Sequence, residues 1–150
     1  MARRGKVSGW ALVAREWPLD GPYSAEQTAE ATRAIEELVR YLAYATRAET
    51  TLPHPVDLYD LLSGLAVALH SLGQVCGQVA VAAEAHAELD GLALDELHPV
   101  QDGEDATVVA GRAADALRGA GVAACDVASH LSLAHAAVGR LRVEYAGGDR

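Results

Sequence analysis

Histidine is the residue type in this sequence best suited to metal chemistry, and six are present. His54 precedes one expected long helix, and His130 and His135 lie near the end of another. In antiparallel neighbours these imidazoles would lie at a similar level, where they could bind zinc or iron. His130 and His135 are five residues apart, however, and do not share a helix face. A metal-binding bundle or metal-dependent enzyme that uses these three histidines is therefore the alternative function.

Nucleophilic catalysis has no support in the sequence. No Gly-x-Ser-x-Gly motif occurs, and neither Cys76 nor Cys125 has a base or cation beside it. Both cysteines lie in apolar helical stretches, which favours free thiols in a cytoplasmic protein. We expect a protein that is not an enzyme and has no cofactor.

Three other residues are candidates for partner binding. Trp10 and Trp17 fall on one helical face of a short N-terminal arm, where they could anchor in a partner's groove or dock on this chain. His86 falls in an apolar row, where a polar side chain can set the register and oligomeric state or respond to pH. A frayed, half-exposed helix end is the alternative for His86.

The elements that carry these residues are long helices. Ser24 and Gln27 form a capping box that begins a helix expected to run to about Ala48. A second helix is expected from about residue 56 to 90, before Gly91. Its apolar residues form two rows, so it should be central. We divide the chain into an N-terminal arm, residues 1–23, and a helical bundle domain, residues 24–150.

The last helix is expected over residues 103–146, with Asp102 as its cap and Gly147 after its end. Small and apolar residues recur along it in alternating steps of four and three, the 3.5-residue period of a helix packed along another helix. Gly119 and Gly121 could form a turn, but the pattern crosses them in phase. The predicted fold is therefore an all-α antiparallel bundle of three long helices, or four if the chain turns at Gly119–Gly121. The members of this expected row are Ala106, Ala110, Ala113, Leu117, Ala120, Ala124, Val127, Leu131, Ala134, Val138, Leu141 and Tyr145.

The charge distribution limits the classes of molecule that this chain is expected to bind. The formal net charge is −9, and no Lys or Arg lies between Arg47 and Arg112. Such an acidic surface repels a phosphate backbone, which excludes nucleic acid, and favours a basic protein partner. Residues 61–83 are uncharged and long enough to span a bilayer, but they carry a polar stripe and no flanking cation, so no membrane association is expected.

The unequal helix lengths indicate self-association. The first long helix is too short to cover the hairpin formed by the other two, and an uncovered two-helix ribbon is marginal in water. We therefore expect a cytoplasmic interaction protein that works as a homodimer, with the two hairpins completing a four-helix bundle. A small apolar ligand between the helices is a further alternative.

Overall fold

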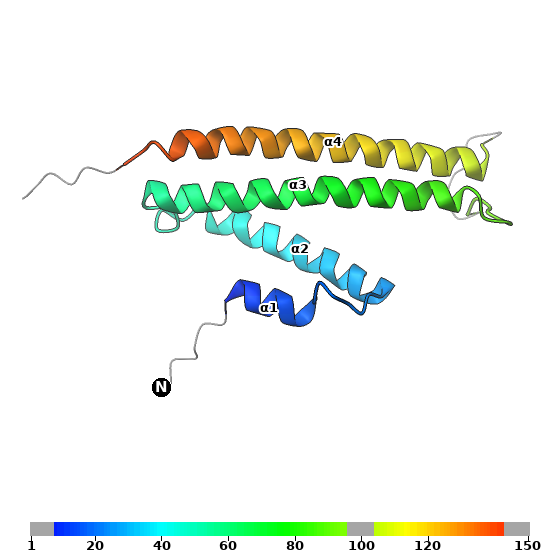
Figure 1. The fold of residues 1–150 in the computed structure, drawn as a ribbon, viewed down its shortest axis with the longest axis horizontal. Coiled ribbons are helices and arrows are strands. Elements are labelled where there is room, and N and C mark those ends of the chain that lie inside the picture. Colours follow the sequence, from blue (N-terminus) through cyan, green and yellow to red (C-terminus); the bar gives the residue numbers. More distant parts are fainter. Residues whose placement is uncertain (1–7, 96–103, 143–150) are drawn as a thin grey trace, which may run out of the picture. The chain divides into compact units, whose positions relative to one another are not determined.

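A computed structural model describes residues 8–95 and 104–142 of the chain. Within these residues all regular secondary structure is helical: α1 (Gly9–Glu16), α2 (Ala25–Ala45), α3 (Pro55–His86) and α4 (Ala106–Val138) (Figure 1). The predicted all-α class is confirmed. The chain divides into two compact units, one ending at Thr51 and the other beginning at Leu52. The domain boundary expected after residue 23 stays a prediction.

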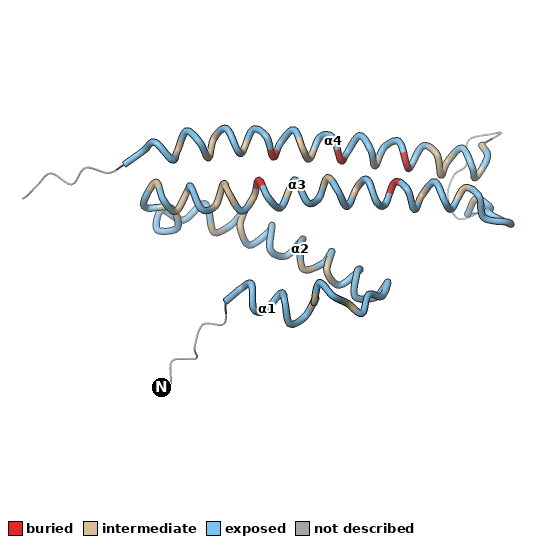
Figure 2. Tube along the Cα trace, viewed as in Figure 1, coloured by how far each residue is buried: buried red, intermediate tan, exposed pale blue. Residues whose placement is uncertain are grey.

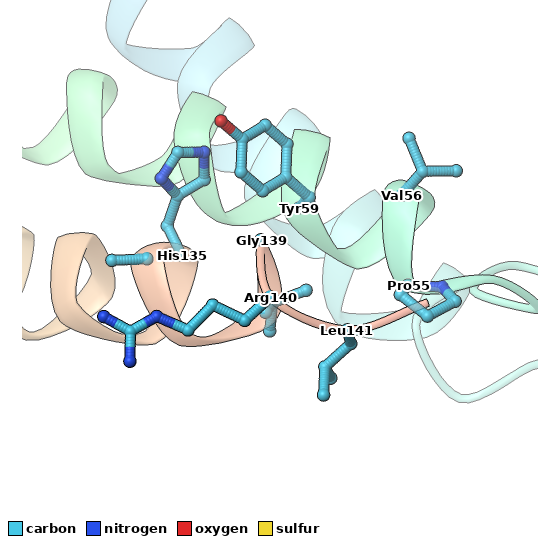
Figure 3. A pocket seen from close by; sticks show the side chains of 9 residues that line it. Pro55, Val56, Tyr59, His135, Gly139, Arg140 and Leu141 are labelled. Atoms are coloured by element: carbon cyan, nitrogen blue, oxygen red, sulfur yellow. The ribbon is translucent and has the colours of Figure 1, made fainter. Parts of the chain in front are cut away.

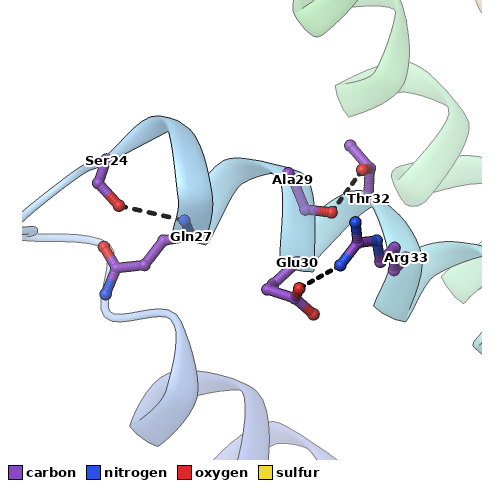
Figure 4. A network of polar contacts seen from close by, with 6 residues as sticks. All are labelled: Ser24, Gln27, Ala29, Glu30, Thr32 and Arg33. Atoms are coloured by element: carbon purple, nitrogen blue, oxygen red, sulfur yellow. Dashed lines mark hydrogen bonds and ion pairs between the residues drawn. The ribbon is translucent and has the colours of Figure 1, made fainter.

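The first unit holds α1 and α2. The Ser24 hydroxyl accepts a hydrogen bond from the backbone N–H of Gln27 at 3.1 Å (Figure 4), so the predicted cap of α2 is confirmed. α2 ends at Ala45, earlier than the expected Ala48, because residues 46–51 form turns. Thr51 closes these turns by donating its hydroxyl proton to the carbonyl of Ala45 at 2.7 Å.

In the second unit, α3 starts at Pro55, whose ring suits the first turn of a helix. The backbone N–H of His54 donates to the Asp57 carboxylate at 3.0 Å. The helix ends at His86 rather than at residue 90, and turns follow it. Gly91 does adopt a positive φ of 81°, but it lies in the last of those turns, between Leu89 and Leu92, and does not end the helix.

Both predicted ends of α4 are wrong. Asp105, not Asp102, caps the helix, and its carboxylate accepts from the Thr107 N–H at 2.7 Å. Asp102 lies outside the described residues, as do Tyr145 and Gly147. The helix ends at Val138 because the chain turns at Gly139, where Leu141 N–H donates to the Val138 carbonyl at 2.8 Å.

α4 continues without interruption through Gly119 and Gly121, so the alternative of a turn there is not observed. Packing explains the second glycine. Gly121 is buried, and a Cβ added to it would lie 3.1 Å from the carbonyl oxygen of Gly73 in α3. These two glycines allow the backbones of α3 and α4 to approach closely.

α3 and α4 lie side by side and run in opposite directions, since Tyr59 near the start of α3 stacks on His135 near the end of α4 (Figure 1). Their buried positions face each other along this contact (Figure 2). These positions are Ala66 and Ala80 in α3, and Ala114, Gly121 and Ala128 in α4. The core of the hairpin therefore consists of very small residues that repeat every seven positions.

The expected apolar row of α4 is only partly correct. Its members Ala110, Leu117, Ala124, Leu131 and Val138 are half-buried beside α3, but Ala113, Ala120 and Val127 are exposed. The buried positions between the two helices are Ala114, Gly121 and Ala128 instead. The smallest residues allow the closest approach of the two helices. α4 is therefore rotated about its axis so that these small residues, and not the predicted row, face α3.

Candidate functional site

The hairpin is built from layers of paired residues, one pair every seven positions. Gly73 and Gly121 form the central layer. Steps of seven residues from it place Ala66 opposite Ala128 and Ala80 opposite Ala114. A further step reaches Tyr59 and His135, whose ring centroids are 3.7 Å apart. At this end two rings take the place of two small residues.

A pocket of about 570 Å³ opens beside this aromatic layer (Figure 3). Its lining includes Tyr59, His135 and Arg140, together with apolar residues of the α3 start and the α4 end. Nε2 of His135 is buried and has no hydrogen-bond partner among the described residues. Buried polar atoms normally have a partner, so this nitrogen costs stability.

One side of the hairpin, called the polar side, carries its ion pairs and most of its polar residues, together with exposed valines such as Val67 and Val81. Arg118 of α4 pairs with Glu84 of α3 across this side and also with Asp115 at 3.1 Å. The hydrogen bond to Glu84 raises the pKa of the Arg118 guanidinium above its ordinary value. A second pocket, of about 410 Å³, lies on the same side, and its polar lining residues are His70, Ser71, Cys125, Ser129 and Ser132.

The opposite side is apolar. Because Glu84 and Arg118 meet on the polar side, the helix positions on the other flank of the small-residue core face away from it. We call these positions the apolar face. In α3 they are Leu58, Leu61, Leu65, Ala68, Leu72, Val75, Val79 and Ala82. In α4 they are Val109, Ala113, Ala116, Ala120, Ala123, Val127, His130, Ala134 and Ala137, of which only His130 is polar.

The apolar face contains no Asp, Glu or Arg, although all three types occur in the unit, which has no Lys. Its larger residues are open to solvent: Leu72 is 41% exposed, Val75 49% and Val79 46%. Contiguous exposed apolar surfaces are typical of interaction sites in proteins. Part of the sequence signal for it was present. Every second member of one predicted row of α3 lies on this face, as does most of the other row. These members are Leu58, Leu65, Leu72 and Val79 of the first row, and Leu61, Ala68, Val75 and Ala82 of the second.

The structure does not bring the three candidate metal ligands together. His54 lies just before α3, His130 is exposed on α4, and His135 stacks on Tyr59. Within residues 8–95 and 104–142, no group of three His, Cys, Asp or Glu side chains is placed to hold a metal ion. The pocket residues His70, Ser129 and Ser132 were missed, because scattered polar residues carry no recognisable motif.

The candidate partner-binding residues lie in both units. Trp10 of α1 is 81% exposed, whereas Trp17 is half-buried in a small pocket with Pro18, Pro22 and Tyr23. His86 is the last residue of α3 and is exposed, at the end of the helix but in line with the apolar face.

Two helices, α3 and α4, are long and apolar enough to cross a membrane by length and composition alone. The same property is shared by core helices of soluble proteins. Comparison with known proteins identifies no relative: no family model, curated protein or solved structure matches the chain.

Proposed function

We propose that this chain is a non-enzymatic cytoplasmic interaction protein that works as a homodimer. In this proposal, α2, α3 and α4 of each copy form an antiparallel bundle of long helices, and helix faces of two copies pair. One observation carries the proposal. Among the described residues of the α3–α4 hairpin, only alanine and glycine are buried, and the leucine and valine side chains stay partly open to water.

The helix lengths support a second copy. At about 1.5 Å per residue, the 21 residues of α2 extend about 32 Å, and the 32 residues of α3 extend about 48 Å. A single α2 therefore covers at most about two thirds of the hairpin length, wherever it packs. Uncovered aliphatic side chains favour association, because each buried Leu or Val contributes roughly 1.5–3 kcal/mol.

The charges support a protein in water rather than in a bilayer. Gly73 of α3 lies opposite Gly121 of α4, which sets the register of the two helices. In this register the uncharged part of α3 lies beside the stretch of α4 after Arg118 only where residues 61–75 meet residues 119–133. This overlap is about 22 Å long, shorter than the ~30 Å of a hydrocarbon core. Asp126 also lies in its centre and is exposed.

The surface outside the apolar face supports an acidic interaction protein. The net charge of −9 favours a basic protein as any further partner and opposes nucleic acid. The exposed Trp10 and the neighbouring Trp17 are suited to anchoring such a partner.

Light scattering coupled to size exclusion tests the proposal. We expect a mass of twice the 15.7 kDa of one chain at micromolar concentration. A monomer at 100 micromolar or so, well above the Kd of an ordinary specific dimer, would contradict it. A Trp10→Ala/Trp17→Ala variant should keep the dimer mass, since the arm serves further partners and not the pairing of copies.

A further inference from the structure

We infer that the apolar face pairs with the same face of a second copy, so that α3 of each copy packs on α4 of the other. This inference rests on the proposed homodimer and specifies which surface forms it. Three properties of the face support it: its shape, its lack of charge and its area.

The face has a raised half and a lowered half. On α3 its members are mostly leucine and valine, such as Leu65, Leu72 and Val79, which form a ridge. On α4 most of its members are alanine, such as Ala113, Ala116 and Ala120, which form a trough. A ridge of large side chains packs well into a row of small ones.

A two-fold axis parallel to the helices uses both halves at once. It places the ridge of each copy over the trough of the other, so the two contacts are identical. All neighbouring helices are then antiparallel, as in a four-helix bundle. An axis that placed α3 on α3 would set ridge against ridge and leave the alanines facing each other across a gap.

The absence of formal charge matters because a copy brings the same residues to the interface. Any Asp or Glu on the face would meet another low-dielectric surface and remain unpaired, which is costly. The charged residues of the hairpin, such as Glu84, Asp115 and Arg118, lie off this face. A basic partner would have no acidic group to bind on it.

The area is sufficient for a stable dimer. Two helices, each about 10 Å across and about 48 Å long, present roughly 900 Å² per copy, or about 1,800 Å² in a dimer, close to the ~1,600 Å² of standard interfaces. α2 is shorter than the face and offers one helix for two. A second hairpin matches both the length and the width.

Two valines of α3 give a matched test. Val79 lies on the apolar face and is 46% exposed, and Val81 lies off it and is 64% exposed. Val79→Glu and Val81→Glu add the same charge to the same turn of the helix. We expect Val79→Glu to weaken dimerisation at least 100-fold, as measured by sedimentation equilibrium, and Val81→Glu to leave the Kd within about threefold.

A second variant, Ala116→Glu on the trough, should weaken the dimer as Val79→Glu does, while circular dichroism confirms that all variants remain helical. A wild-type dimer that survives both Val79→Glu and Ala116→Glu would overturn this inference and leave the proposed homodimer standing. A monomeric wild type would overturn both. Flotation of the wild type with vesicles of neutral phospholipid, lost in Val79→Glu, would assign the face to a membrane and also overturn the inference.

Discussion

The α3–α4 hairpin has two apolar surfaces that differ in the size of their residues. The inner surface lies between the two helices, and the outer surface is the apolar face. Between the helices, Ala66, Ala80, Ala114 and Ala128 flank a glycine pair and are almost completely buried. On the apolar face, larger side chains such as Leu72 and Val79 remain open to solvent. Small residues thus determine how closely the chain packs on itself, whereas the larger ones remain available to another molecule.

The largest effect is expected from enlarging a glycine of the inner surface. Gly121→Val places a branched side chain against Gly73, because even the added Cβ would lie 3.1 Å from its carbonyl oxygen. We expect a loss of about 1–3 kcal/mol in the free energy of unfolding, measured by urea titration. Gly119→Val is the control, since a Cβ there meets nothing within 4 Å. Equal effects of the two variants would show that the inner surface is not closely packed.

The outer surface should make stability depend on concentration. If unfolding is coupled to dissociation of a dimer, each tenfold rise in concentration adds about 1.4 kcal/mol of stability per mole of dimer. Thermal melts from one to 100 micromolar, followed by circular dichroism, measure this shift. A midpoint that stays constant over this range would contradict a role of the apolar face in self-association.

A smaller effect is expected at the aromatic layer, where the inner surface is least regular. His135→Leu removes the buried Nε2 that lacks a partner while keeping an apolar group beside Tyr59. We expect a gain of up to about 1 kcal/mol in the free energy of unfolding. His70→Leu, an exposed histidine of α3, should leave it unchanged. A clear loss of stability in His135→Leu would show that Nε2 is hydrogen-bonded in solution.

The smallest effect is expected from the ion pair on the polar side. Glu84 and Arg118 are both about half exposed, so solvent screens their attraction. Glu84→Gln should change the urea midpoint only slightly, and the change should vanish at high salt. Because the pKa of Arg118 is raised, its charge and the stability linked to it persist below that pKa and are lost only in strong alkali. We therefore expect the small difference in stability between wild type and Glu84→Gln to stay constant from pH 7 to pH 10, and a difference that changes over this range would contradict the assignment to Arg118.

The helical class and the cap at Ser24 were predictable because they depend on local sequence. The continuity of α4 through Gly119 was also predictable, because the apolar pattern keeps its phase there. The rotation of α4 was not. Alanines occur on several faces of this helix, so hydrophobicity does not distinguish them, and only the matched positions of Gly73 and Gly121 identify the inner one.

The candidate site was predictable only in part. The apolar row of α3 that contains Leu72 and Val79 was visible from its helical spacing. Whether these two side chains are exposed, however, depends on which residues of α3 pack against α4. The position of His135 on Tyr59 depends on the register of two helices, which no local pattern encodes. The pairing of Glu84 with Arg118 has the same origin.

The seven-residue spacing of the alanines and glycines between α3 and α4 has a consequence for handedness. Helices held together at such intervals wind around each other in a left-handed supercoil, because an ideal helix drifts by about 20° per seven residues. A further helix that packs along this supercoiled hairpin must bend with the same handedness and pitch. The supercoil of the hairpin thus favours partner helices whose own apolar residues recur every seven residues.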